Sequence, residues 1–238
     1  RMNLDKTINF IKGIAMDTTV TPIAPNFVCF KNGLLDLSTT TLKPHDSSVF
    51  VVNQIPHDYD PAATCPNWEK FIEEVVKPGD VCFFQEWVGY CFYLGHPEAV
   101  FLIMIGNGQN GKTITIITLI HVLGEDNVTH ISLADLTYDE FAPAELYNKL
   151  ADISDDIGSY AIKNAGKLRE CSGSSRIKAE RKYGQPFYFK PYAKLAYTCN
   201  EPPEILDQSD AIKMRLRVVE FPAKFSKNPI GDEKPAKD

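Results

Sequence analysis

The chain has 238 residues, of which 44% are hydrophobic and 24% are charged, and its formal net charge is −6. This composition is typical of a soluble globular protein with a substantial core, and the sequence contains no internal repeats or low-complexity tracts. No apolar run approaches the ~18 residues that a membrane-spanning helix needs, so no membrane partner is expected.

The six cysteines contain no CxxC pair, and no clustered Cys/His arrangement predicts a metal site. Apolar neighbours, as around Cys82 and Cys91, predict buried free thiols, which indicate a reducing compartment such as the cytoplasm. The first residue is not Met and residues 1–5 lack the apolar stretch of a secretory signal, so a fragment of a longer chain is expected. Residues 232–238 read as a cut or disordered end.

Charge is distributed unevenly along the chain. From Glu125 to Tyr160 there are nine acidic residues and one Lys, whereas from Lys163 to Lys194 there are nine basic residues and two acidic ones. A locally basic segment in an acidic protein suits a small surface that contacts phosphate groups. A solvated basic face without a partner is the alternative.

The first part of the chain predicts a small mixed β/α domain. Residues 27–30 and 34–37 flank Lys31-Asn32-Gly33, which is a hairpin signal, and residues 49–52 predict a further strand. From Asn67 the apolar period becomes helical, with Asn67 as the expected cap. Asp80 is the expected cap of a second helix. Gly95-His96-Pro97 ends this helix, and we expect a domain boundary near residue 97.

After residue 97, strands and helices alternate. The unbroken apolar run at 100–105 predicts a buried parallel strand, and a helix is expected from Lys112 to Leu123. Further strands are expected at 149–154, 193–199 and 216–221. This alternation predicts a three-layer α/β domain with a parallel sheet over residues 98–225, followed by a polar tail over 226–238.

A glycine-rich segment that matches GxxxxGK[ST] lies between the first of these strands and its helix. Its glycines let backbone N–H groups surround a phosphate, and the helix N-terminus adds positive potential. Its lysine reaches the outer phosphates and its threonine hydroxyl binds Mg²⁺. The sequence therefore predicts ATP binding by Gly106, Asn107, Gly108, Gln109, Asn110, Gly111, Lys112 and Thr113.

A motor also needs an acidic residue at the end of a neighbouring strand, where it holds Mg²⁺ and polarises water. Asp155 and Asp156 follow the strand expected at 149–154. Adjacent carboxylates in a strand point to opposite faces, so one is expected to order the metal shell and the other to act on water. A solvated acidic turn is the alternative.

A basic hairpin is expected where residues 176–181 and 186–190 flank a turn that contains Gly184. It would raise cations and one aromatic ring on a projecting loop, which is the combination that binds a nucleic-acid strand. These side chains are Lys178, Arg181, Lys182 and Tyr183. An ordinary exposed hairpin is the alternative.

Two polar residues near the end of the chain complete the candidate site. Asn200 leaves a strand tip, where it is expected to hydrogen-bond the γ-phosphate or the attacking water. Arg215 precedes the last strand and is a candidate finger that stabilises charge in a neighbouring subunit's site. A structural salt bridge is the competing interpretation of Arg215.

In this order, the segments GNGQNGKT, ISDD, SGSSRIKAERKYGQPFYFKPYAKLAYTCNEPPE and DAIKMRLRVVEFP resemble a superfamily 3 helicase. The chain is most similar to the phage/plasmid-type primase–helicases, whose relatives include the poxvirus replicative helicase. The resemblance covers about residues 27–225. It implies an AAA+-like motor that forms a ring, usually a hexamer, and travels along one DNA strand.

The resemblance also implies roles for individual residues. Lys112 and Thr113 match the Walker A motif, Asp155 and Asp156 the Walker B pair, Asn200 the sensor, Lys178 and Lys182 the DNA-tracking hairpin, and Arg215 the arginine finger. The sequence departs from the family pattern at Met214, where relatives often carry a first Arg, so Arg217 is a second finger candidate. It also carries only Asp in Walker B, where many relatives have Glu.

The expected function is therefore that of an ATP- and Mg²⁺-dependent helicase motor acting on single-stranded or forked DNA as a homo-oligomeric ring. The expected location is the host cytoplasm or a viral replication compartment, and family members commonly carry an added primase–polymerase domain. Two alternatives stay open. One is a P-loop nucleotide kinase, and the other is an initiator or loader that uses ATP only for assembly.

Overall fold

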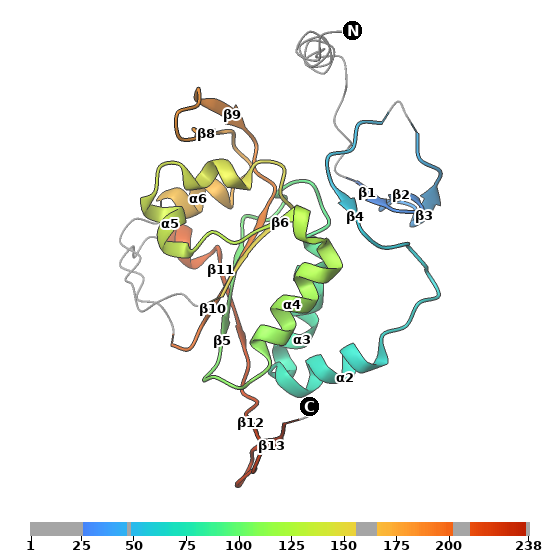
Figure 1. Ribbon diagram of the computed structural model, residues 1–238, viewed down its shortest axis with the longest axis vertical. Coiled ribbons are helices and arrows are strands. Elements are labelled where there is room, and N and C mark those ends of the chain that lie inside the picture. The colour runs from blue at the N-terminus through green and yellow to red at the C-terminus, as the bar shows by residue number, and fades with distance from the viewer. Residues whose placement is uncertain (1–25, 47–48, 156–165, 202–209, 237–238) are drawn as a thin grey trace, which may run out of the picture.

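The computed structural model describes residues 26–46, 49–155, 166–201 and 210–236 (Figure 1). At its centre lies a five-stranded sheet in the order β11–β5–β10–β7–β6, with every neighbouring pair parallel. The strands are β5 (Phe101–Ile105), β6 (Val128–Thr129), β7 (Ala151–Ser154), β10 (Lys194–Cys199) and β11 (Leu216–Glu220). The predicted α/β fold with a parallel sheet is confirmed.

The central strands are apolar throughout because the sheet is covered on both faces. On β5, Leu102 and Met104 pack into one hydrophobic cluster, and Phe101 and Ile103 pack into the other. The first cluster includes α2 (Pro66–Val75), α3 (Val81–Tyr90) and α4 (Lys112–Leu123), and the second includes α5 (Leu133–Tyr138) and α6 (Gly166–Cys171). The alternation of side chains along each strand thus produces three layers.

The N-terminal elements form a separate small sheet in the order β3–β2–β1–β4. The predicted hairpin is confirmed as an antiparallel pair, and the four strands are β1 (Phe27–Phe30), β2 (Gly33–Asp36), β3 (Thr41–Lys43) and β4 (Gln54–Ile55). The strand predicted at 49–52 is wrong. Phe50 and Val52 are largely exposed, and pairing with β1 is made instead by β4, whose Ile55 is buried.

One predicted helix cap is wrong, and the other is confirmed in position only. Helix α2 begins at Pro66, before Asn67, because a proline at the first helical position needs no hydrogen-bond acceptor for an N–H. Asp80 is the N-cap residue of α3, but its side chain makes no capping hydrogen bond; its Oδ2 accepts a hydrogen bond from the Glu220 amide at 3.1 Å and joins the start of α3 to the end of β11. Helices α2 and α3 share a core with the central sheet, and the domain boundary near residue 97 stays a prediction.

The remaining elements lie at the two ends of the sheet (Figure 1). A β-hairpin projects at one end, and a short strand pair near the C-terminus lies at the other. These elements are β8 (Ile177–Ala179), β9 (Phe187–Phe189), α7 (Asp210–Lys213), β12 (Phe225–Ser226), β13 (Lys234–Pro235) and three 3-10 helices (Pro78–Asp80, Glu125–Asn127, Ala142–Leu146).

Two smaller expectations need correction. The C-terminal end is ordered as far as residue 236, since Lys234 Nζ donates to the Glu74 carbonyl at 2.8 Å. Cys91 is buried as predicted, but Cys82 lies on the exposed face of α3 despite its apolar neighbours. Among the described residues, no helix is long and apolar enough to span a membrane.

Candidate nucleotide and nucleic-acid sites

Three neighbouring strands end at the same edge of the central sheet and place three predicted site residues there. Ile105 of β5 pairs with Cys199 of β10, and Tyr197 of β10 pairs with Ser154 of β7. The residues that follow these strands therefore emerge together at the carboxyl edge, which is where parallel sheets bind ligands. They are Gly106, Asn200 and Asp155.

The glycine-rich loop after β5 is too closely packed for larger residues at two positions. A Cβ on Gly106 would lie 2.2 Å from Asn110 Nδ2 and 2.5 Å from the Phe221 carbonyl oxygen. A Cβ on Gly111, whose φ is 92°, would lie 2.8 Å from Val75 Cγ1 of α2. Helix α4 then begins at Lys112, whose amide donates to Asn110 Oδ1 at 3.3 Å. The N-cap residue, Gly111, offers no side-chain cap to the next amides, which an anion can therefore use.

Lys112 is folded over this loop and is only 5% exposed. Its Nζ donates to the Gly106 carbonyl and lies 3.5 Å from Asn200 Oδ1. The structure thus brings together the predicted phosphate-binding lysine and the predicted sensor, which are 88 residues apart in the sequence. Both contacts are to uncharged oxygens, which phosphate oxygens would replace with stronger, charge-assisted hydrogen bonds.

Asp155 lies at the end of β7 and accepts a hydrogen bond from the Thr198 hydroxyl of β10. Thr198 was not among the predicted site residues, and the only signal for it was its place two residues before Asn200 on the same strand. Thr113 lies exposed in the first turn of α4. Asp156 lies outside the described residues, so the pairing of the two carboxylates stays a prediction.

A second carboxylate of β7, Asp152, is buried away from this edge. It accepts hydrogen bonds from the Ile131 amide at 2.8 Å and from the Tyr197 hydroxyl at 2.9 Å. Burial raises its pKa to about 7, although both hydrogen bonds act in the opposite direction. Asp152 is therefore a core residue that links β7, β10 and the segment before α5.

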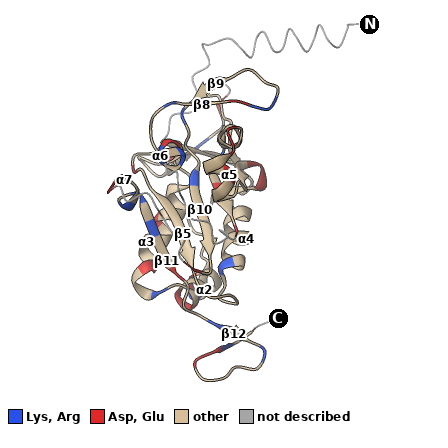
Figure 2. Ribbon diagram, turned by 90° about the vertical axis from the view of Figure 1, so that its left-hand side faces the viewer, with Lys and Arg blue, Asp and Glu red and all other residues tan. Residues whose placement is uncertain are grey.

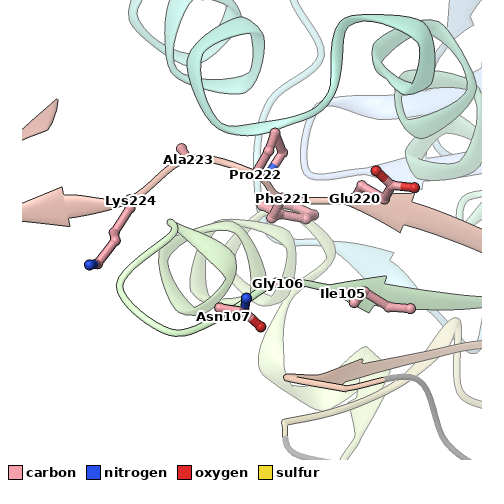
Figure 3. Close-up of a pocket in the computed structure, with 8 residues that line it drawn as sticks. All are labelled: Ile105, Gly106, Asn107, Glu220, Phe221, Pro222, Ala223 and Lys224. Carbon is pink, nitrogen blue, oxygen red and sulfur yellow. The ribbon is translucent and has the colours of Figure 1, made fainter. Parts of the chain in front are cut away.

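Cavities lie on two sides of the loop. One, of about 300 Å³, separates Gly106 and Asn107 from Phe221 and Pro222, with Lys224 at its outer end (Figure 3). The other, of about 840 Å³, is lined by apolar side chains of α2, α4 and β12 together with polar groups. Its apolar residues are Phe71, Ile114 and Phe225, and the Phe225 amide donates to the Gln109 carbonyl at 2.8 Å.

The basic hairpin forms as predicted, with Lys178 of β8 opposite Tyr188 of β9. Tyr183 at its tip is 96% exposed and adopts a left-handed conformation with φ of 63°. The positive φ of this turn thus lies at Tyr183, next to Gly184. Arg181 packs its guanidinium over the Phe187 ring at 5.1 Å, and Lys182 Nζ lies 5.4 Å from the Tyr183 ring centroid.

Arg215 lies at the amino edge of the sheet, at the end opposite to the phosphate loop. Its carbonyl accepts a hydrogen bond from Phe101, the first residue of β5, at 3.0 Å, so the length of the strand, about 16 Å, separates it from Gly106. Its Nη1 donates to the Ala211 carbonyl at 3.0 Å, and it makes no salt bridge within the described part of the chain. Arg217 Nη1 donates to the Met214 carbonyl at 2.7 Å.

Comparisons with known proteins match both parts of the chain. A family described as D5 N terminal like matches residues 3–77, and a family of unknown function, DUF5906, matches residues 104–215. Protein 121R of Invertebrate iridescent virus 3 is 24% identical over 218 residues, which are 84% of this chain and 23% of that protein. Protein 022R of Frog virus 3 is 28% identical over 208 residues, which are 83% of this chain and 21% of that protein. Both bear provisional helicase names.

Solved structures share the fold. An apo structure of the NrS-1 C-terminal region superposes with a TM-score of 0.60 at 16% identity, over 91% of this chain and 52% of that one. A second structure of this region gives a TM-score of 0.56 at 20% identity, over 69% and 40% of the two chains.

The chain spans only about a quarter of the length of its curated viral relatives. It nevertheless combines a D5-like N-terminal segment with a phosphate-loop domain, and its viral relatives match across both parts. In both parts the chain is thus similar to viral primase–helicases of the superfamily 3 type.

Proposed function

We propose that this chain is the ATP-hydrolysing motor of a viral DNA helicase and that Mg²⁺ is its cofactor. The observation that carries the proposal is the contact between Lys112 Nζ and Asn200 Oδ1 at 3.5 Å, beside the strand end that bears Asp155. A cation, an amide and a carboxylate at one sheet edge are the groups that phosphoryl transfer to water requires. The helicase names of the viral relatives support the same function.

In this proposal the loop Gly106–Thr113 holds the triphosphate through backbone N–H groups, the start of α4 and Lys112. Thr113 and Asp155 would hold Mg²⁺, together with Asp156, and the ion would neutralise charge on the outer phosphates. Asn200 orients the γ-phosphate or the attacking water. The Thr198 hydroxyl donates to one oxygen of Asp155 and so holds this carboxylate in place at the sheet edge.

The apolar cavity beside the loop is a suitable place for the nucleoside part of ATP. Its volume of about 840 Å³ lies in the range of small-molecule sites. The aromatic rings of Phe71 and Phe225 would contact the flat base, and Gln109 joins the cavity wall to the phosphate loop.

The proposed motor is an oligomeric ring, because Arg215 lies at the sheet edge opposite to its own phosphate loop. An arginine in this place can serve only the ATP site of a neighbouring subunit. The hairpin residues Lys178, Arg181, Lys182 and Tyr183 would bind single-stranded DNA, with the cations on phosphates and the tyrosine on a base.

Measuring ATP turnover with and without single-stranded DNA, beside displacement of a strand from forked DNA, tests this proposal. A helicase motor hydrolyses ATP faster with DNA and displaces the strand. A nucleotide kinase would instead need a phosphate acceptor and ignore DNA. An initiator or loader would bind DNA with little turnover and no displacement.

A further inference from the structure

A second cavity, of about 640 Å³, lies at the amino edge of the sheet and is strongly basic. It is formed by α6, the loop after it, the start of β8, and the residues just before β5 and β11. Five cations line it, Lys167, Arg169, Arg176, Lys178 and Arg215, against one acid, Glu170. Glu170 is already paired with Lys167, since their charged atoms lie 3.3 Å apart. The remaining four cations have no carboxylate partner within the described residues.

The cavity also offers hydrogen-bond donors that the protein leaves unused. The Ser174 and Ser175 amides, in the loop that follows α6, donate to no acceptor in the described parts of the chain. Arg215 uses Nη1 on the Ala211 carbonyl, and its Nε is buried without an acceptor. Because a buried donor without an acceptor is unfavourable, an oxyanion that accepted a hydrogen bond from this guanidinium would relieve a penalty.

The anion cannot be the nucleotide bound by the same chain. Arg215 precedes β11 and Ala99 precedes β5, so the cavity lies at the edge opposite to the phosphate loop. The ligand must therefore come from another molecule. Lys178 lines the cavity and also belongs to β8, the first β-strand of the basic hairpin. Because the cavity and the hairpin are continuous, the single-stranded DNA that the hairpin is proposed to contact is the favoured ligand of the cavity.

We infer that this cavity is a second binding site for nucleic acid, which takes a backbone phosphate of the single strand, with Arg169 and Arg176 as its principal ligands. The inference rests on the proposed function, because it assumes that the hairpin contacts a strand. It adds a contact away from the hairpin tip. A phosphate held there would lie next to Arg215. The DNA strand would therefore bind in the same cavity as the arginine that is proposed to reach the ATP site of the neighbouring subunit.

The test measures binding of labelled poly-dT by fluorescence anisotropy over a series of salt concentrations. In the double variant Arg169→Gln/Arg176→Gln, the slope of log affinity against log salt should become shallower by about 0.7, the value for one single-strand phosphate that is no longer neutralised. The affinity at about 0.1 M salt should fall on the order of tenfold. Arg169→Lys/Arg176→Lys keeps both charges and should largely restore the slope.

Lys31→Gln is the matched control, because it removes one exposed cation on the N-terminal sheet, far from the cavity. Thermal unfolding shows whether each variant is folded. If the double variant unfolds, the single variants Arg169→Gln and Arg176→Gln take its place, and each should weaken poly-dT binding. A wild-type chain that binds poly-dT and a double variant with an unchanged slope would overturn this inference alone. A chain that binds no strand at all would count against the proposed function instead.

A third outcome would also overturn the inference. The double variant could bind poly-dT normally but hydrolyse no ATP by itself, and regain turnover when mixed with Lys112→Ala subunits, whose cavity is intact. The cavity would then hold the triphosphate of a neighbouring subunit.

Discussion

The two ends of the central sheet both bear groups that are suited to binding phosphate, but they are built in different ways. At the carboxyl edge the donors are backbone N–H groups, a helix start and one buried lysine, packed so closely that a Cβ on Gly106 would meet two neighbours. At the amino edge the hairpin of β8 and β9 projects from the rest of the domain (Figure 2). The donors there are long side chains on this hairpin and around an open cavity, and Tyr183 is almost fully exposed. Rigid geometry selects one compact ligand, whereas exposed cations bind a polyanion irrespective of sequence.

One strand connects these two ends. The hairpin leads into β10, which begins at Lys194 and is followed by Asn200 at the carboxyl edge. Lys194 fixes the beginning of this strand, since its Nζ donates to the Gly95 carbonyl at 2.9 Å and the Tyr192 carbonyl at 2.8 Å. A buried strand of six residues is a rigid link, so a displacement of the hairpin would be transmitted to Asn200.

The largest effect is expected for Lys112→Ala. Loss of the only lysine of the phosphate loop should reduce ATP turnover on the order of 10³-fold, because it removes the cation nearest the developing charge. Steady-state phosphate release measures this. Binding of poly-dT should stay within about twofold of wild type, since the lysine lies at the other end of the sheet. Retained turnover would refute the assignment of the carboxyl edge.

Arg215→Ala should reduce turnover almost as much, about 10³-fold, if the residue acts on a neighbouring subunit. Mixed with Lys112→Ala subunits, it should regain part of the turnover, because an intact loop then faces an intact arginine. Subunit exchange followed by fluorescence transfer shows whether mixed oligomers form. If mixed oligomers form but turnover does not recover, Arg215 does not act between subunits. The same experiment with Arg217→Ala shows whether Arg217, the second candidate, is the arginine finger.

A smaller effect is expected at the hairpin tip. Tyr183→Ala should weaken poly-dT binding about tenfold, since stacking of a base on an aromatic ring contributes roughly 1–3 kcal/mol. It should leave the salt dependence unchanged because no charge is removed. Tyr138→Ala, at an exposed tyrosine of α5, is the matched control. Equal affinities in both variants would exclude stacking at the tip.

The smallest effect concerns the core between the two ends. The pKa of Asp152 is raised to about 7 in the folded state from an ordinary value near 3.8, chiefly by burial. Between pH 3.8 and 7 the folded state binds more protons than the unfolded state. The contribution of Asp152 to the free energy of unfolding therefore falls as the pH rises toward 7. Asp152→Asn should flatten this dependence in urea unfolding at pH 4 to 7, and parallel curves for wild type and variant would refute it.

Expectations that rest on neighbouring residues were largely confirmed. The apolar run at 100–105, the helix from Lys112 and the hairpin around Tyr183 each depend on local periodicity and turn chemistry, and each forms as expected. The same local rules failed where a tertiary partner decided the outcome. Asp80 bonds to the end of β11 in place of its own helix, and Val52 stays exposed because Ile55 takes the buried place beside β1.

The sequence by itself determined which residues have the chemistry to hold a triphosphate and to touch a strand, because these types and spacings are local features of the chain. Only the tertiary structure decided which of them meet. The order of the parallel strands puts β10 between β5 and β7, and so brings Asn200 to Lys112 and Thr198 to Asp155. The same order sends Arg215 to the opposite edge, into a cavity with Arg169 and Arg176. Strand order is set by which apolar faces bury one another across the whole chain, and no local spacing encodes it.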